Sequence, residues 1–366
     1  MEPKQFMLFC LNFSGMVYVN GGSFLKAYVI YQTCAFIIFG TSLILFAYFE
    51  PKPLIAKLQT LHFLIALSQI FCKFLSIALN QRETVDILDN LEKLSKEAFT
   101  DQKNAEILKR ANKSSTKLPK IFMYVFCGYY PLRTINLLIR YLVFKSPQKF
   151  VEASWIPPFL ASNYLTGLIY QVATCLCTGF TNAAYTGLII FLTIQLSGQI
   201  QILRRAMEDG YPIKECVVLH QKLLRLFFRI NRLLNALMLA EYILSSLYSC
   251  ISTFLILKSL SSGGKGVANN AYVLVLVLLR VFLICYCGNI IQTQGEKLHS
   301  SAYFGEWYRK SLPEKKSVQL MMSLTMVQPF KYNYRRILTV DMALFLKSIH
   351  TTYSYLTMLL SFADHK

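Results

Sequence analysis

The stretch VANNAYVLVLVLLRVFLICYCGNII, Val267–Ile291, decides the class of fold. It is long enough to cross the hydrocarbon core of a bilayer as a helix, which takes about 20 residues. Arg280 is its only charged side chain. A continuous apolar run of this length is typical of a membrane-spanning helix, and the rest of the chain can be searched for others like it.

Six further stretches have the same character, and the composition agrees with them. The chain of 366 residues is 54% hydrophobic and only 16% charged, whereas a soluble domain is about 25% charged. Its mean hydropathy is +0.41. We therefore expect an all-α membrane protein that forms a single seven-helix domain. The seven predicted spans are 28–49, 55–79, 121–144, 159–194, 240–257, 267–291 and 337–362.

The connections between the spans predict how the chain is oriented in the membrane. Connections two, four and six (residues 80–120, 195–239 and 292–336) hold nine, seven and eight Lys or Arg, or 24 of the chain's 38. Basic connections stay in the cytoplasm. The N-terminus should then be cytoplasmic and the C-terminus extracellular. The same orientation explains the formal net charge of +19 without a nucleic-acid partner.

The long cytoplasmic connections should themselves be helical. Val85, Leu88, Leu91 and Leu94 recur at the spacing of one helix face. The segment CVVLHQKLLRLFFRINRLLNAL in the fourth connection is similar and basic. We expect these segments to extend the spanning helices into a cytoplasmic anchor domain.

Several functional classes lack their motifs in this chain. The sequence has no glycine-rich phosphate loop, no H-E-x-x-H and no G-x-S-x-G. No cysteine pair has a zinc spacing, so we expect no enzyme, metal or cofactor. The inverted orientation and the missing Asp/Glu-Arg-Tyr and Asn-Pro-x-x-Tyr motifs argue against a G-protein-coupled receptor. A transporter would show inverted repeats or a pair of spans broken by Gly or Pro. We see neither in this sequence.

Charged residues inside the predicted spans are candidate structural sites. Such a group costs about 2.5–3.5 kcal/mol at the centre of a spanning helix, so it usually has a partner or faces water. For Arg280 we expect an internal partner, and Glu241 and Asp341 lie near the inner ends of their spans. For Lys73 and Lys347 we expect snorkelling or a wet face.

The last span carries a stripe of polar side chains. Lys347, Thr351, Ser354, Met358 and Ser361 or Phe362 share one helix face, with an apolar outer end. Hydroxyl residues of this kind hold spanning helices together. Alternatively, the stripe lines a wet pore with an apolar constriction. One helix cannot enclose a pore, so the second alternative requires several copies.

The C-terminal third resembles the insect odorant receptors. GEKLHSSAYFGEWY (295–308) is similar to the family's loop with a Tyr and a Trp. The segment 320–362 resembles its Pro-Phe turn and closing Ser/Thr-Tyr helix, and LHQKLLRLFFRINRLL (219–234) resembles its fourth-connection helix. Gustatory receptors, which are related and can work as homotetramers, usually have Gln at the position of Ser361. The resemblance is therefore to the odorant branch.

The resemblance implies an odorant-gated, poorly selective cation channel whose last helix lines a central pore. If the family's roles apply to this chain, Met358 and Phe362 would form the hydrophobic gate. Ser361 would lie beside the outer mouth, with Thr351 and Ser354 deeper in the pore. The fourth connection is shorter than that of the family's co-receptor. We therefore expect a tuning subunit that joins the co-receptor in a heterotetramer.

The resemblance also implies partners, a location and a binding site. The partners would be a small volatile organic ligand, membrane lipid and permeating cations, in the plasma membrane of olfactory sensory neurons. The ligand would bind in the outer half of the bundle among the second, third, fourth and sixth spans. The candidates are Leu67, Ile70, Phe71, Tyr129, Leu132, Asn136, Tyr164, Leu168, Gln171, Asn269, Tyr272 and Leu276.

Overall fold

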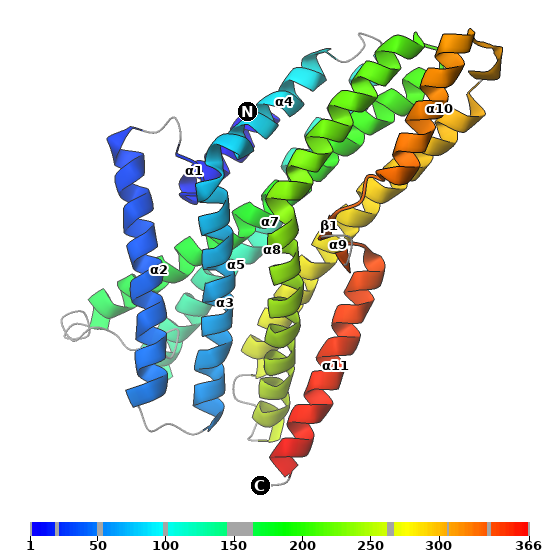
Figure 1. The fold of residues 1–366 in the computed structure, drawn as a ribbon. Helices are drawn as coiled ribbons and strands as arrows, with labels where there is room; N and C mark the ends of the chain where they lie inside the picture. Colours follow the sequence, from blue (N-terminus) through cyan, green and yellow to red (C-terminus); the bar gives the residue numbers. More distant parts are fainter. Residues whose placement is uncertain are drawn as a thin grey trace.

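Helices form almost all of this computed structural model (Figure 1). It describes residues 2–18, 22–49, 54–97, 102–144, 164–261, 267–305, 307–334 and 338–364. The elements are α1 (Pro3–Phe13), α2 (Ser23–Phe49), α3 (Leu54–Leu79), α4 (Gln81–Glu97), α5 (Gln102–Phe144), α7 (Tyr164–Glu208), α8 (Ile213–Ser261), α9 (Val267–Phe304), η1 (Trp307–Arg309), α10 (Leu312–Val327), β1 (Asn333–Tyr334), β2 (Leu338–Thr339) and α11 (Met342–Asp364).

Several helices are much longer than a bilayer is thick. Helix α8 has 49 residues, so it is about 74 Å long, against about 30 Å for the hydrocarbon core. In Figure 1 the long helices α5, α7, α8 and α9 continue upward beside α4 and α10, beyond the level of α2, α3 and α11. The C-terminus lies at the opposite end of the molecule from α4 and α10. Part of the long helices must therefore lie outside the membrane.

Five of the helices are long and apolar enough to cross a membrane by themselves: α2, α3, α7, α8 and α9. Helices α5 and α11 coincide with the two other predicted spans but are less apolar over their described residues. Helix α11 carries Lys347 and His350 besides its hydroxyl groups, and the first half of α5 is polar. The first residues of two predicted spans, 159–163 and 337, lie outside the described residues.

The last helix begins later than the predicted span because a short hairpin precedes it. Strands β1 and β2 pair antiparallel, with Asn333 opposite Thr339. Helix α11 then starts at Met342, where Asp341 Oδ1 accepts a hydrogen bond of 2.9 Å from the backbone N–H of Leu344. Asp341 therefore caps the helix, and its role as an intramembrane charge stays a prediction.

Helix α7 is the central element of the bundle and packs against α5, α9, α8 and α3. Its segment from Thr181 to Phe191 is buried throughout. At Gly288, helix α9 packs closely against the backbone of Val340, just before α11 begins. A Cβ atom at this position would overlap the carbonyl oxygen of Val340. Only glycine permits this approach, which fixes the start of α11 against α9.

Candidate functional site

Three charged side chains meet inside the bundle. Glu241 on α8 lies between Lys73 on α3 and Arg280 on α9. Its Oε2 atom is 2.5 Å from the Lys73 ammonium nitrogen, and its Oε1 atom is 2.5 Å from Arg280 Nε. All three side chains are buried. We call these residues the ionic cluster; it contains two cations and one carboxylate.

Neutral polar groups complete the ionic cluster. Arg280 Nη2 donates to Gln69 Oε1 at 3.0 Å and to Ser245 Oγ at 3.1 Å. Lys73 Nζ donates to Asn182 Oδ1 at 2.8 Å. Buried charges need such partners because burial removes their hydration. The ionic cluster and its partners join α3, α7, α8 and α9 at one depth in the bundle.

The expected internal partner of Arg280 is therefore present, and it is Glu241. The expectation for Lys73 was wrong, because this side chain is buried and paired instead of reaching toward the headgroups. A signal for this pairing was available in the sequence. Gln69 and Lys73 lie four residues apart on one helix, and Glu241 and Ser245 lie four apart on another, so each pair shares a helix face.

Among the contacts that connect this part of the bundle to α11 are a hydrogen bond, a close backbone approach and the edge-to-face packing of Phe282 on Phe345. Ser246 Oγ on α8 and Ser348 Oγ on α11 are 3.1 Å apart and share a hydrogen bond between buried groups. The second contact is the close approach of Val340 to Gly288. Ser246 adjoins Ser245, a partner of Arg280, and Gly288 lies two turns beyond Arg280 on α9. A movement of α8 or α9 would therefore reach α11 directly.

The predicted stripe on α11 is left uncovered by the rest of the chain. Ser354, Met358 and Ser361 are exposed, Met358 to 55%, and Thr351 is half-buried. The hydroxyls of Ser354 and Ser361 donate to carbonyl oxygens of their own helix. The stripe therefore makes no hydrogen bond to another helix among the described residues. The hydroxyl of α11 that bonds another helix is that of Ser348, which lies beside the stripe. The side chain of Phe362 is outside the described ones.

The twelve predicted odorant-binding residues have mixed surroundings. Leu67, Ile70, Leu168, Gln171 and Leu276 are buried, while Phe71, Tyr164 and Asn269 are half-buried. Leu132 and Tyr272 are exposed, and the side chains of Tyr129 and Asn136 lie outside the described ones.

Some of the twelve contact neighbouring helices. Leu168 packs on Leu137 with Tyr164 beside it, and the Tyr272 hydroxyl donates to the carbonyl oxygen of Val125 at 3.2 Å. Leu276 lies one turn from Arg280, and Ile70 follows Gln69. Of the candidates on α3 and α9, Ile70 and Leu276 are therefore near the ionic cluster along their helices. None of the twelve lines either of two cavities in the described chain, one between α2 and α7 and one among α1, α4, α5 and α7.

These features define a multi-pass helical membrane protein with a polar centre and an uncovered last helix. Comparison with known proteins identifies its family. Residues 51–353 match the family model described as 7tm odorant receptor, and the chain belongs to this family.

The curated relatives are distant but similar over much of their length. Odorant receptor 33a of Drosophila melanogaster is 22% identical over 346 residues, covering 89% of this chain and 88% of the relative. Odorant receptor 47a of the same organism is 22% identical and covers 80% of each chain. Odorant receptor 94a is 24% identical over a shorter stretch, 42% of this chain and 40% of the relative.

Solved structures show the same fold. The insect olfactory receptor OR5 from Machilis hrabei in complex with eugenol matches with a TM-score of 0.80 at 16% identity, over 98% of this chain and 97% of the receptor. A second structure of OR5 matches with a TM-score of 0.73 at 15% identity. The resemblance seen in the sequence and the all-α membrane fold are thereby confirmed. Membership of this family also makes the chain a receptor and not an enzyme.

Proposed function

We propose that this chain is the odorant-binding subunit of a ligand-gated, poorly selective cation channel, with α11 lining the pore. The observation that carries the proposal is the uncovered polar stripe of α11. Within a membrane, an uncovered helix face with hydroxyl residues such as Ser354 and Ser361 is typical of contact with neighbouring helices or of a wet pore. Other copies of the same kind of subunit, arranged around α11, would supply both.

The gate in this proposal is the apolar outer end of the stripe. Met358 and Phe362 would narrow the pore enough to exclude water when the channel is closed. Ser361 would lie beside the outer mouth, and Thr351 and Ser354 would face the wet pore below the gate.

The ligand in this proposal is a small volatile organic molecule bound in the outer half of the bundle. Binding among α3, α5, α7 and α9 would favour the bundle arrangement that the ligand fits better. The buried candidates Ile70 and Leu276 lie near the ionic cluster, which in turn reaches α11 through the contacts at Ser348 and Gly288. The change would thus pass from the ligand to the pore helix through packed and hydrogen-bonded groups.

The proposal includes partners and a location. The chain would act as a tuning subunit with the co-receptor of the family in a heterotetramer, surrounded by lipid in the plasma membrane of olfactory sensory neurons. The segments 80–120, 195–239 and 292–336 would form the cytoplasmic anchor, and the C-terminus would lie outside the cell. The short fourth connection and the distribution of basic residues support these assignments.

Two experiments test the proposal. Currents evoked by a panel of volatiles are recorded from cells that express this chain with and without the co-receptor. We expect responses only with the co-receptor; responses from the chain alone would instead support the gustatory-type homotetramer. A tag at the C-terminus should be labelled on intact cells, and labelling only after permeabilisation would contradict the orientation and the pore.

A further inference from the structure

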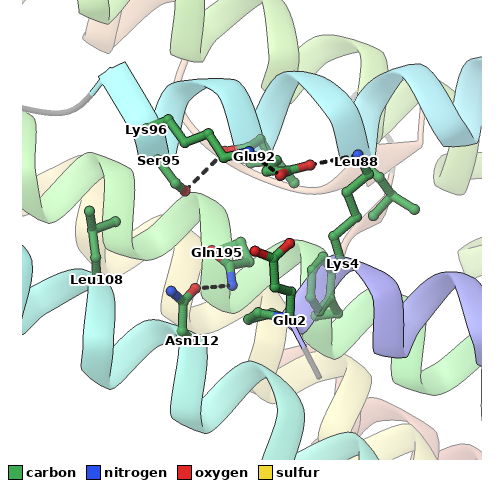
Figure 2. Close-up of a pocket in the computed structure, with 12 residues that line it drawn as sticks. Glu2, Lys4, Leu88, Glu92, Ser95, Lys96, Leu108, Asn112 and Gln195 are labelled. Atoms are coloured by element: carbon green, nitrogen blue, oxygen red, sulfur yellow. Dashed lines mark hydrogen bonds and ion pairs between the residues drawn. The ribbon is translucent and has the colours of Figure 1, made fainter.

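A cavity of about 250 Å³ lies far from the predicted ligand site, among α1, α4, α5 and α7 (Figure 2). In the proposed orientation it is on the cytoplasmic side, next to the first turn of α1. It is distinct from the twelve odorant-binding candidates and from the pore stripe. Its lining combines an apolar wall with charged and neutral polar side chains from α1, α4, α5 and α7.

One carboxylate in this cavity makes no direct ion pair, although it is near enough to Lys96 to help raise the pKa of that ammonium. Glu2 is the N-cap residue of α1, but its side chain forms no capping hydrogen bond. Figure 2 shows this carboxylate pointing into the space between α4 and the pair Asn112–Gln195. It forms no ion pair with any residue in the described part of the chain. Glu2 is exposed, so its carboxylate lies where the cavity opens to solvent.

The amide pair opposite Glu2 offers a further acceptor. Gln195 Nε2 donates to Asn112 Oδ1 at 2.8 Å and to Ser115 Oγ at 2.9 Å. These bonds use the NH₂ group of Gln195 and leave its Oε1 atom as an acceptor. A ligand that donates hydrogen bonds would therefore find both a charged and a neutral acceptor.

The lysines around the cavity are already neutralised. Glu92 lies 2.5 Å from both Lys4 Nζ and Lys96 Nζ, and Asp89 is 2.8 Å from Lys4. Hydrogen bonds from Lys4 and then Lys96 lower the pKa of Glu92 to about 2, so it remains charged at neutral pH. Two acids thus balance two lysines, and Glu2 leaves one negative charge in excess.

Apart from Ser95, the rest of the wall is apolar. Leu88 and Leu91 on α4, Leu108 on α5 and Phe191 on α7 line the cavity. An anion would be repelled by Glu2. A divalent metal ion would need several oxygen ligands, and no group of three or more His, Cys, Asp or Glu gathers for one among the described residues.

We propose that this cavity binds a small organic ammonium, a protonated primary amine with a hydrocarbon or aromatic body. The ammonium would donate to Glu2 and to Gln195 Oε1, while the body packs on Leu88, Leu108 and Phe191. The ligand would enter from the cytoplasm and bridge α1 to α4, α5 and α7. The receptor would thus have a second, amine-selective site on the face opposite its odorant site.

Phenethylamine is the probe, and phenethyl alcohol is its neutral counterpart. Binding of each is measured by titration calorimetry to the purified full-length chain in nanodiscs at neutral pH. The measurement does not depend on channel activity, so it is independent of the proposed function. Both compounds could also bind the odorant site, and for this reason the readout is the difference between the wild type and variants of the cavity.

We expect Glu2→Gln to weaken phenethylamine binding by about two- to fivefold, which is the contribution of a charge pair at an exposed carboxylate. Phenethyl alcohol should bind this variant and the wild type alike. Leu108→Trp, which fills the cavity, should also weaken the amine. Glu215→Gln is the matched control, because it removes an exposed acid from the first turn of α8, away from the cavity.

Three results would overturn the proposal. They are an absence of amine binding to the wild type, equal amine affinity in the wild type and Glu2→Gln, and a loss of amine binding in Glu215→Gln as large as in Glu2→Gln. Because Glu2 is exposed and makes no direct ion pair, Glu2→Gln should fold normally. The test therefore does not depend on how Leu108→Trp folds.

Discussion

The polar residues of the ionic cluster and those of α11 both lie within the bundle's predicted spans, yet their surroundings are opposite. Lys73, Glu241 and Arg280 are buried and find their partners on α3, α8 and α9 of the same chain. Ser354 and Met358 on α11 are exposed and have no partner on another helix among the described residues. The ionic cluster is complete in one chain, whereas the α11 stripe requires something outside it.

This difference separates two reasons for placing polar groups in a membrane. A satisfied cluster fixes the relative positions of helices, because any displacement would leave a charge unpaired. A stripe of hydroxyl residues that the rest of the chain leaves uncovered predicts neighbouring helices or a wet pore. Four predictions test this division, from the largest expected effect to the smallest.

The largest effect should come from Glu241→Gln, because it leaves two cations buried without an anion. Breaking a buried ion pair in this way costs about 3–5 kcal/mol. Lys73→Met should be much milder, because Glu241 and Arg280 still neutralise each other. The amount of folded receptor at the cell surface and its thermal stability measure both. Equal damage from the two variants would contradict the charge balance described for the ionic cluster.

Gly288→Ala should separate α9 from the chain that leads into α11. The added Cβ overlaps the carbonyl oxygen of Val340, and overpacking of this kind costs about 1–3 kcal/mol. We expect the ligand-evoked current to fall strongly for the same amount of protein at the surface. The matched control is Gly128→Ala in helix α5, where a Cβ would meet nothing within 4 Å. A normal current from Gly288→Ala would exclude this contact from the gating route.

The pair of substitutions Met358→Ala and Phe362→Ala tests the α11 stripe. A wider and less apolar constriction should stay wet, so the current without ligand should rise. Leu346→Ala is the control, because this exposed residue of α11 lies outside the stripe and its outer apolar end. An unchanged basal current in a properly assembled channel would show that the gate lies elsewhere.

The smallest effect concerns the ion pairs of α1 with α4. Lys4 and Lys96 lower the pKa of Glu92 to about 2, below the value of about 4.3 for an unpaired Glu. The folded state therefore binds fewer protons than the unfolded state between these values, and stability falls as the pH drops from about 4.3 toward 2. Thermal unfolding across this range should be less dependent on pH in Glu92→Gln than in the wild type. If thermal unfolding depends equally on pH in both proteins, other carboxylates are responsible for that dependence.

Much of this architecture could be predicted from the sequence because membrane helices leave a strong pattern. The run Val267–Ile291 and its counterparts predicted the helical fold, and Arg280 in an apolar run predicted an internal partner. The stripe on α11 followed from helical spacing alone, and Ser354, Met358 and Ser361 are exposed in the described chain; its place in a pore stays a prediction.

Other features depended on contacts that are distant in sequence. The pairing of Lys73 with Glu241 joins residues on two helices, and a lysine near a helix end fits snorkelling equally well. The capping role of Asp341 depended on the hairpin that delays α11. The odorant-binding residues could be placed only by depth in the bundle, because the shape of a pocket depends on how several helices pack.

The charges of the ionic cluster also lie within the electric field across the membrane. When Lys73 is protonated, two cations and one carboxylate leave a single positive charge in excess, and a charge moved across the whole membrane gains or loses about 2.3 kcal/mol per 100 mV. If opening shifts the cluster by a tenth of the membrane thickness, each subunit contributes about 0.2 kcal/mol per 100 mV. In the proposed heterotetramer, each copy of this chain would thereby add a shallow sensitivity to the voltage of its own cell.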